Sequence, residues 1–250
     1  MNNIDRFSHM ENDYSKYRPN YSSEAINYII SKYILNNNSV IADVGAGTGK
    51  LCLPFLEKGI TVYGIEPNYD MFHKCLENLG SYSNFKGVNC SAEAIDLTNN
   101  SVDLVTVGQA FHWFDAGLFK NECTRILKEN PVVAIIYNNG DYDKKIIKEI
   151  HSLSSKYCPE YKGSSGGLNR NEEIFNNFFL NYEKIIFKND YVLNKEQFIG
   201  LNFSASYAPK QNSENYTIYL NELERIFDKY SENGYITMPN NTILRIGNIK

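Results

Sequence analysis

The sequence predicts an α/β fold in which helices cover both faces of a mostly parallel sheet. The first observation is a series of short apolar runs typical of strands, at 40–44, 61–66, 85–88, 102–109 and 132–137. The second is that helical patterns separate these runs, which predicts βαβ units with right-handed crossovers. The third is the nearly continuous apolar character of 102–109, as expected for a strand buried on both faces.

The helices of the first half follow from capping residues and apolar spacing. Ser22 is placed to cap a helix whose apolar residues share one face: Ile26, Ile29, Ile30, Tyr33 and Ile34. A glycine-rich turn after the first strand leads into a helix over about 49–58. Asn68 opens the next helix, and Asp115 can cap another that runs to about Glu129.

The second half of the chain is less regular. Helical patterns cover about 143–157, 195–203 and 213–231, and strands are expected at 182–188 and 243–249. The segment 162–173 has the glycine and serine content of a loop. Without a repeat or a linker, we expect one domain over 1–250, divided into an N-terminal lid segment (1–21), a ligand-binding core (22–140) and a substrate-side embellishment with closing strands (141–250).

Composition excludes several classes of protein. The net charge of -4 and the pI near 5.7 disfavour tight nucleic-acid binding, which usually uses a basic face. The five cysteines form no C-x-x-C pair, which argues against a zinc site or a disulfide framework. The polar N-terminus has no apolar signal region, and no apolar run is long enough to span a bilayer. We therefore expect a cytoplasmic protein that is not bound to a membrane.

The glycine turn after the first strand predicts a ligand site, because glycines let a ligand approach the backbone closely. A dinucleotide fingerprint would have a small residue where Lys50 stands. A phosphate-binding P-loop would have a glycine at Val44 and a hydroxyl residue at Leu51. What remains is D-x-G-x-G-x-G from Asp43, with Glu66 at the end of the next strand, where a carboxylate can accept both ribose hydroxyls.

This pattern resembles the first two motifs of class I S-adenosylmethionine-dependent methyltransferases. Ser91-Ala92-Glu93 is similar to the segment that meets the adenine edge in that family. The stretches that resemble a type-11 small-molecule subgroup are Tyr14-Ser-Lys-Tyr-Arg-Pro, Gln109-Ala-Phe-His-Trp-Phe-Asp115 and Ser204-Ala-Ser-Tyr-Ala-Pro. The resemblance implies a Rossmann-like sheet of seven strands, a helical lid over the carboxyl ends of the strands, and S-adenosyl-L-methionine as cofactor.

The resemblance also implies a role for each matching residue of the cofactor site. The turn around the methionine part of the cofactor consists of Gly45, Ala46, Gly47 and Gly49. Glu66 takes the ribose, and the residues flanking the adenine are Pro67, Asn68 and Met71. The adenine edge is met by Ser91, Ala92 and Glu93.

Three further residues are implied at the methionine end of the cofactor. Asp43 orients the turn or, through water, the amino group; its alternative role is to cap the neighbouring helix. Gln109 lies near the sulfonium and offers its backbone carbonyl. Arg18, or Tyr17 beside it, meets the methionine carboxylate, unless Arg18 is only a solvated surface residue.

Methyl transfer from a sulfonium is an in-line displacement, so the protein contributes mainly alignment and exclusion of water. His112 is the candidate base for an acceptor that must lose a proton, and the competing interpretation is that it only positions its loop. We expect Tyr14, Trp113 and Tyr207 to line an acceptor pocket for a small molecule, under a lid from 1–21 and parts of 140–235. No histidine has metal-ligand spacing, so no metal is expected, and the protein is expected to be a monomer or homodimer.

Three alternatives stay open at this point. Gly163-Ser-Ser-Gly-Gly167 matches the G-x-S-x-G nucleophile elbow, but its flanks are polar and loop-like rather than a strand and a helix. A nicotinamide-dependent oxidoreductase uses a similar glycine turn, against which Lys50 argues. A non-catalytic binding module with the same fold would keep Glu66 and the turn without turnover.

Overall fold

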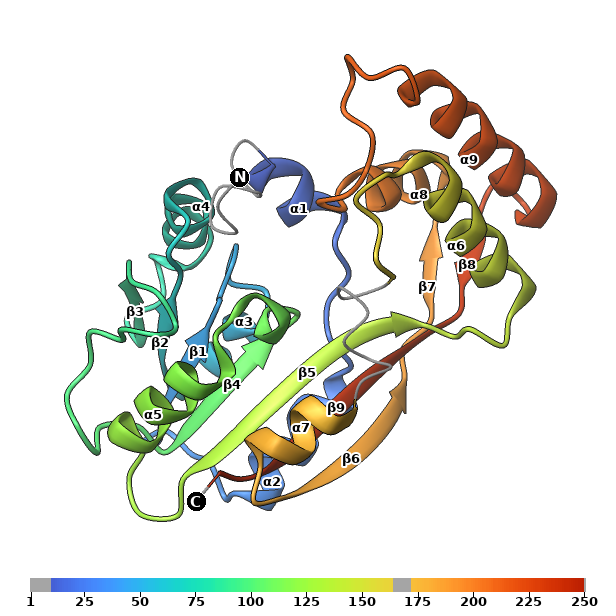
Figure 1. Ribbon diagram of the computed structural model, residues 1–250. Helices are drawn as coiled ribbons and strands as arrows, with labels where there is room; N and C mark the ends of the chain where they lie inside the picture. The colour runs from blue at the N-terminus through green and yellow to red at the C-terminus, as the bar shows by residue number, and fades with distance from the viewer. Residues whose placement is uncertain (1–9, 164–171, 250) are drawn as a thin grey trace.

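The computed structural model describes residues 10–163 and 172–249 and has the expected α/β architecture (Figure 1). One sheet of seven strands has the order β3-β2-β1-β4-β5-β9-β6. Its strands are β1 (Val40–Val44), β2 (Thr61–Ile65), β3 (Phe85–Val88), β4 (Leu104–Gly108), β5 (Val132–Gly140), β6 (Asn181–Lys188) and β9 (Asn240–Asn248). The pairs among β1 to β5 are parallel, and β9 pairs antiparallel with both β5 and β6. The expected mostly parallel sheet is thus confirmed.

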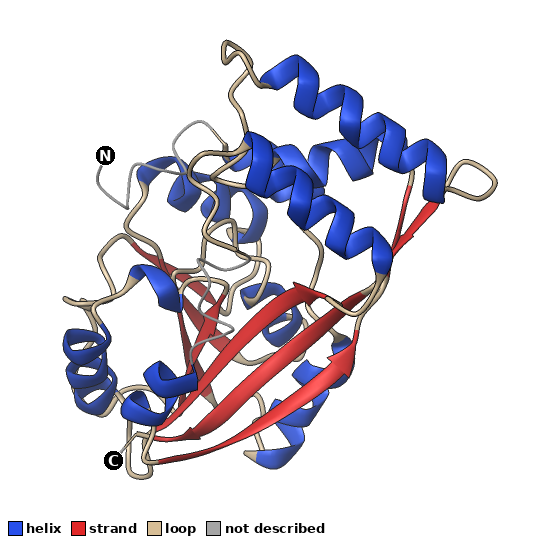
Figure 2. Ribbon diagram, turned by 45° about the vertical axis from the view of Figure 1, so that its right-hand side comes forward, coloured by secondary structure: helices blue, strands red, loops and turns tan. Residues whose placement is uncertain are grey.

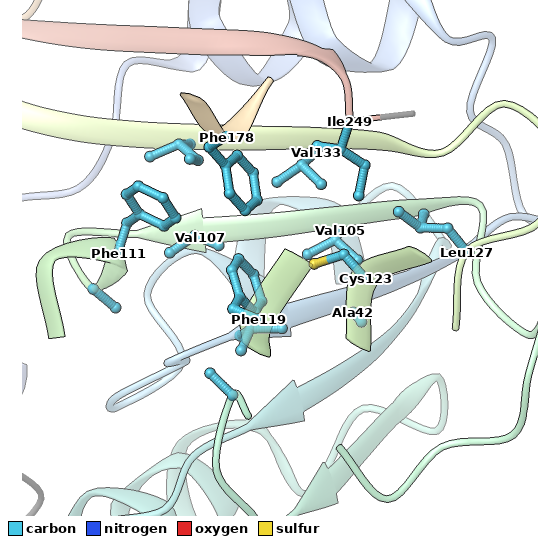
Figure 3. Packing of buried hydrophobic residues seen from close by; sticks show 14 of the residues in the cluster. Ala42, Val105, Val107, Phe111, Phe119, Cys123, Leu127, Val133, Phe178 and Ile249 are labelled. Atoms are coloured by element: carbon cyan, nitrogen blue, oxygen red, sulfur yellow. The ribbon is translucent and has the colours of Figure 1, made fainter. Parts of the chain in front are cut away.

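Alternating side chains of the central strands divide the core into two layers. In β1, Ile41 packs with the helices of one face and Ala42 with those of the other, because successive strand residues point to opposite faces. The first face carries α2 (Ser23–Lys32), α3 (Cys52–Leu56) and α4 (Tyr69–Leu79), and the second carries α5 (Ala116–Ile126) and α7 (Glu172–Phe178). Figure 3 shows the second layer, where Phe119 and Phe178 lie against strand residues such as Val107.

A helical cap with a core of its own stands beyond the upper ends of the strands (Figure 2). It contains α6 (Lys145–Tyr157), α8 (Lys195–Phe203), α9 (Tyr216–Tyr230) and the small antiparallel pair of β7 (Tyr191–Leu193) and β8 (Ile236–Met238). The helix α1 (Glu11–Tyr17) lies between this cap and α4 (Figure 1). The expected lid over the carboxyl ends of the strands is therefore present in the described residues.

Several element boundaries differ from the sequence expectations. The helix expected over 49–58 is only α3, because residues 45–51 form the glycine turn, and the last strand of the first half continues to Gly140. Ser22 precedes α2 but its side chain makes no capping bond; instead its N–H donates to Thr242 Oγ1 at 3.1 Å. The helix α1, the helix α7 and the pair β7–β8 were not expected.

Two sequence-based expectations fall partly outside the described residues. The lid segment 1–21 is described only from residue 10, and of the G-x-S-x-G match only Gly163 is described. Most of the loop expected at 162–173 also lies outside the described residues.

Candidate active site

The glycine turn joins the end of β1 to α3 in a backbone conformation that side chains rarely adopt. Gly45, Gly47 and Gly49 all have positive φ, between 57° and 87°. The N–H groups of Gly45 and Ala46 both donate to the carbonyl of Ile65, at 2.8 and 2.9 Å, which fastens the turn to the end of β2. These two hydrogen bonds therefore hold the turn against the end of β2.

Glu66 follows β2 and presents a buried carboxylate beside the turn. Its two oxygens accept the backbone N–H groups of Gly47 at 2.8 Å and Asn68 at 2.9 Å. Burial raises the pKa of Glu66 to about 7, although these two hydrogen bonds act in the opposite direction. A carboxylate so poorly solvated favours a ligand that brings further hydrogen-bond donors to it.

Asp43 lies at the end of β1 and is almost fully buried. It accepts hydrogen bonds from Thr106 Oγ1 at 2.8 Å and Cys52 Sγ at 3.1 Å, and burial raises its pKa to about 6. Its contacts join β1, β4 and α3, and among the described residues no helical backbone N–H donates to it.

A small cavity of about 110 Å³ opens next to Glu66 at the carboxyl ends of β1, β2 and β4. Its lining includes most of the residues expected around the nucleoside: Glu66, Pro67, Met71, Ser91, Ala92 and Glu93. It also includes Gly45, Gly47 and Gln109, which were expected at the methionine end. Trp113 and Phe114 close it from the segment after β4. The sequence-based site residues thus converge although they come from four separate strand ends.

A larger cavity of about 490 Å³ lies between the sheet and the helical cap. It is lined by Asp43, Ala46 and His112 from the core side, by Arg18 after α1, and by Tyr207 from the cap side. Both cavities share the residues Tyr14, Gly45, Gly47, Gly108, Gln109 and Trp113. The two cavities therefore meet at the carboxyl ends of β1 and β4.

Gln109 follows β4 in a left-handed conformation, with φ of 57°, which is uncommon for a residue other than glycine. Its side chain is fully engaged with the backbone of Asn138 in β5, since Oε1 accepts from N–H at 2.9 Å and Nε2 donates to the carbonyl at 3.3 Å. This leaves mainly the backbone of Gln109 for contact with a ligand in the cavities.

His112 stands in the one-turn helix η2 (Phe111–Trp113) and lines the large cavity. Its Nδ1 is 3.3 Å from the hydroxyl of Tyr137, and its ring centroid is 4.4 Å from that of Trp113. Burial lowers the pKa of His112 to about 4, so the imidazole is neutral at pH 7. Burial also raises the pKa of Tyr137, which therefore keeps its proton.

Some expected site residues lie outside both cavities. Asn68 uses its side chain to cap α4, with Oδ1 accepting from Met71 N–H at 3.0 Å. A Cβ on Gly49 would be 2.4 Å from Leu79 Cδ1, so this glycine serves the packing of α4 against the turn. Tyr17 donates to Glu196 Oε1 at 3.0 Å and is absent from both cavity linings.

The structure adds lining residues that the sequence did not single out for the site. Tyr21, Lys50 and Asn138 come from positions next to elements that were expected. Tyr191 and Asn240 come from β7 and the start of β9, which the strand patterns did not predict. No local sequence pattern identifies Tyr191 and Asn240 as site residues. Asn240, for example, reaches the site only because β9 pairs with β5, which places it opposite Gly140.

Two absences hold for residues 10–163 and 172–249. In these ranges no three histidine, cysteine or acidic side chains are grouped as a metal ion would require. Within the same ranges no helix has both the length and the apolar character for crossing a membrane. The five cysteines are all free thiols.

The chain is similar to known methyltransferases in sequence. Residues 42–135 match the model of the type-11 methyltransferase domain. A Dictyostelium discoideum protein named as a methyltransferase is 32% identical over 169 residues, which are 63% of this chain and 62% of that protein. A Schizosaccharomyces pombe protein named as methyltransferase-like is 32% identical over 149 residues, 58% of this chain and 56% of its own. The matches thus span less than two thirds of these relatives.

Solved structures have the same fold at low sequence identity. A type II methyltransferase from Anaeromyxobacter dehalogenans has a TM-score of 0.70 at 16% identity, covering 93% of this chain and 98% of its own. A methyltransferase of an antibiotic biosynthesis pathway in Anabaena variabilis has a TM-score of 0.61 at 19% identity, covering 88% and 96%. The chain is therefore similar to a methyltransferase domain in sequence over residues 42–135 and has the fold of solved methyltransferases.

Proposed function

We propose that this protein transfers a methyl group from S-adenosylmethionine to a small molecule held in the large cavity. The observation that carries the proposal is the meeting of the two cavities at the glycine turn and Gln109. A nucleoside in the small cavity would put the reactive end of the cofactor at the mouth of the large one. The large cavity, about 490 Å³, has the size of a site for a small ligand and lies beneath the helical cap.

The nucleoside end of the cofactor fits the small cavity by the chemistry of its donors and acceptors. Each oxygen of the buried Glu66 carboxylate accepts one backbone N–H and can accept a second hydrogen bond. The two ribose hydroxyls would supply these additional donors. The apolar side chains of Pro67 and Met71 suit the faces of an adenine, and Ser91 and Glu93 offer polar groups to its edge.

The glycine turn also fits the cofactor. A Cβ on Gly47 would have only Tyr14 Cε1 within 4 Å, at 3.9 Å, so the space beside this backbone is open to a ligand. Asp43 and Ala46 line the large cavity below the turn and are proposed to border the methionine end. Arg18 lines the large cavity and not the small one, and that position favours a ligand other than the nucleoside.

When bound, the cofactor would supply a methyl group on a sulfonium sulfur. A lone pair of the acceptor would attack the methyl carbon in line, and the sulfur would leave with the C–S bonding pair. The chain's own part is to align the acceptor and keep water out. Trp113 and Tyr14 line both cavities, so they are placed to restrict the approach of an acceptor to the methyl group.

His112 is proposed as the group that takes a proton from an acceptor that must lose one. Its imidazole is neutral at pH 7, and its Nε2 makes no hydrogen bond in the described part of the chain. The low pKa makes it a weak base, so it suits a proton that becomes acidic only as the methyl group arrives. Tyr137 holds the ring through Nδ1.

The proposal extends to the compartment and the assembly. Five free thiols and no disulfide among the described residues support a reducing compartment such as the cytoplasm. We propose a monomer or homodimer, and an acidic protein of net charge -4 is a poor partner for nucleic acid.

The deciding experiment is calorimetric titration with S-adenosylhomocysteine and, separately, NADH. We expect binding of the first ligand only. Turnover is then sought in a screen of small acceptors that detects S-adenosylhomocysteine formation. Binding of NADH instead would establish the oxidoreductase alternative, and cofactor binding without any turnover would favour the non-catalytic module.

A further inference from the structure

Three buried polar groups in the large cavity have no hydrogen-bond partner. They are Nε of Arg18, the hydroxyl of Tyr191 and Nδ2 of Asn240. Arg18 follows α1, Tyr191 begins β7 and Asn240 begins β9, so three distant segments bring them to one cavity. Unpartnered buried polar groups are rare in folded proteins because each one costs free energy, and a ligand is one explanation for such a cluster.

Arg18 brings a positive charge that no carboxylate in the described residues neutralises. Its Nη2 donates to the backbone carbonyl of Ser204 at 3.0 Å, and its guanidinium carbon lies 5.4 Å from the centroid of the Tyr14 ring. Neither contact supplies a negative charge. A partly buried guanidinium without an anion is unfavourable, so this position favours an anionic ligand.

Tyr191 and Asn240 are held in place by the backbone around them. Asn240 is 4% exposed; its N–H donates to Asp190 Oδ1 at 3.0 Å and its carbonyl accepts from Asn189 N–H at 2.9 Å. Tyr191 pairs with Met238 in the β7–β8 ladder. Burial raises the pKa of Tyr191, while the charge of Arg18 and the side chain of Asn240 lower it.

The remaining charges of the large cavity also favour an anion. Lys50 is half-buried there, forms no ion pair with a described residue, and has its pKa lowered by burial. The buried carboxylate of Asp43 is engaged by Thr106 and Cys52. The other carboxylate in the lining, Glu160, is exposed on the cap.

We propose that Arg18, Tyr191 and Asn240 bind a carboxylate of the methyl acceptor, so that the substrate is a small organic acid. This inference rests on the proposed methyltransferase function. One guanidinium and two neutral donors suit a group with a single negative charge and two acceptor oxygens, and the planar guanidinium matches a carboxylate in shape.

The methionine carboxylate of the cofactor is the alternative ligand for these three groups. Because Arg18, Tyr191 and Asn240 do not line the small cavity, they are not placed to contact the nucleoside. The methionine end is proposed to border the large cavity at Asp43 and Ala46, close to the glycine turn. Tyr191 and Asn240 also belong to the strand ends beneath the cap, whereas the glycine turn lies at β1. Their position therefore favours the acceptor.

The experiment is calorimetric titration of the protein saturated with S-adenosylhomocysteine, using a panel of small mono-, di- and tricarboxylic acids. The primary amides of the same skeletons are the neutral controls. We expect at least one acid to bind, with its amide about tenfold weaker or worse, as a lost charge-assisted hydrogen bond implies. Tyr191→Phe and Asn240→Leu should each weaken the acid about tenfold. Neither should change S-adenosylhomocysteine affinity more than about twofold. The exposed Tyr235→Phe is the matched control and should change neither affinity.

The outcomes separate this inference from the proposed function. If S-adenosylhomocysteine binds but acids and amides bind equally or not at all, the carboxylate site is wrong and the methyltransferase proposal stands. If Arg18→Met or Tyr191→Phe weakens S-adenosylhomocysteine instead of the acid, the carboxylate belongs to the cofactor and the inference is overturned. If the wild-type protein does not bind S-adenosylhomocysteine, the proposed function itself fails and the inference falls with it.

Discussion

The two cavities are built in different ways although they share a boundary. The small cavity takes its lining from residues that directly follow strands, such as Gly45 after β1, Glu66 after β2 and Gln109 after β4. The large cavity is also lined by Arg18, Tyr191 and Asn240, and Arg18 is more than 170 positions away in the chain from the other two. A ligand common to a whole family can be bound by short motifs, whereas the wall facing the acceptor depends on how distant segments pack.

The largest effect expected of a single substitution tests whether the glycine turn depends on its backbone. Gly45→Ala would place a Cβ 2.5 Å from Ala110 Cβ at a φ of 71°. Left-handed strain and overpacking together should lower the free energy of unfolding by roughly 3–4 kcal/mol. Urea denaturation measures it. Gly234→Ala is the matched control, because its φ is 80° but nothing lies within 4 Å, so only strain of about 1 kcal/mol is expected. Equal losses in both variants would contradict the packing argument.

The second prediction concerns the pH dependence of stability of the cofactor-free protein. The folded-state pKa is raised to about 7 at Glu66 and about 6 at Asp43. This contribution to stability is complete below the unfolded-state pKa values near 4 and is lost as pH rises through 6 to 7. We expect the free energy of unfolding to fall by about 5 kcal/mol between pH 4.5 and 8, of which about 3 kcal/mol comes from Glu66. Glu66→Gln should show a smaller fall in the same denaturation series; an unchanged slope would exclude Glu66 as a source.

The third prediction concerns the ribose contact. Glu66→Ala should weaken S-adenosylhomocysteine by about 2–3 kcal/mol, roughly 30- to 150-fold, through loss of a charge-assisted hydrogen bond. Because hydroxyl donors favour the ionised carboxylate and its pKa is about 7, wild-type affinity should rise about tenfold from pH 6 to pH 8. Calorimetry at both pH values checks this, with Glu66→Gln expected to show no such rise. A pH-independent wild type would mean that the carboxylate does not meet the ribose.

The fourth prediction addresses His112 in the wall between the two regions. With an acceptor found in the screen, His112→Ala should lower turnover about 10- to 100-fold if the acceptor must lose a proton. The wild-type profile should show no inflection near pH 6.5 from this residue, because burial lowers the pKa of His112 to about 4. Turnover of His112→Ala that matches the wild type from pH 6 to 9 would end the base proposal.

The smallest effect is expected at Tyr137, which holds the His112 ring. Tyr137→Phe removes the 3.3 Å contact to Nδ1 and should cost about 1 kcal/mol of stability. If Tyr137 positions the ring, Tyr137→Phe should reduce turnover a few-fold when His112 is present. In a protein that already carries His112→Ala, the same substitution should not change turnover. Additive losses in the double variant would show that Tyr137 acts independently of His112.

Much of the core could be predicted because its signals are local. The strands β1 and β3 have the expected bounds, and Asn68 and Asp115 cap α4 and α5 as their positions indicated. The α3 boundary was wrong because the turn conformation at Gly49 delays the helix to Cys52. The strands β7 and β8 were missed because each has only three residues, too few for a periodic pattern.

The sequence by itself determined the doubly wound sheet, the glycine turn and the carboxylate of Glu66. Each depends on residues close together in the chain, whose spacing obeys strand and turn geometry. Only the tertiary structure decided that Gly49 serves the packing of α4, and that Arg18 shares a cavity with Tyr191 and Asn240. The physical reason is that the antiparallel pairing of β9 with β5, and the packing of the cap on the sheet, join segments whose contacts leave no periodic trace in the sequence.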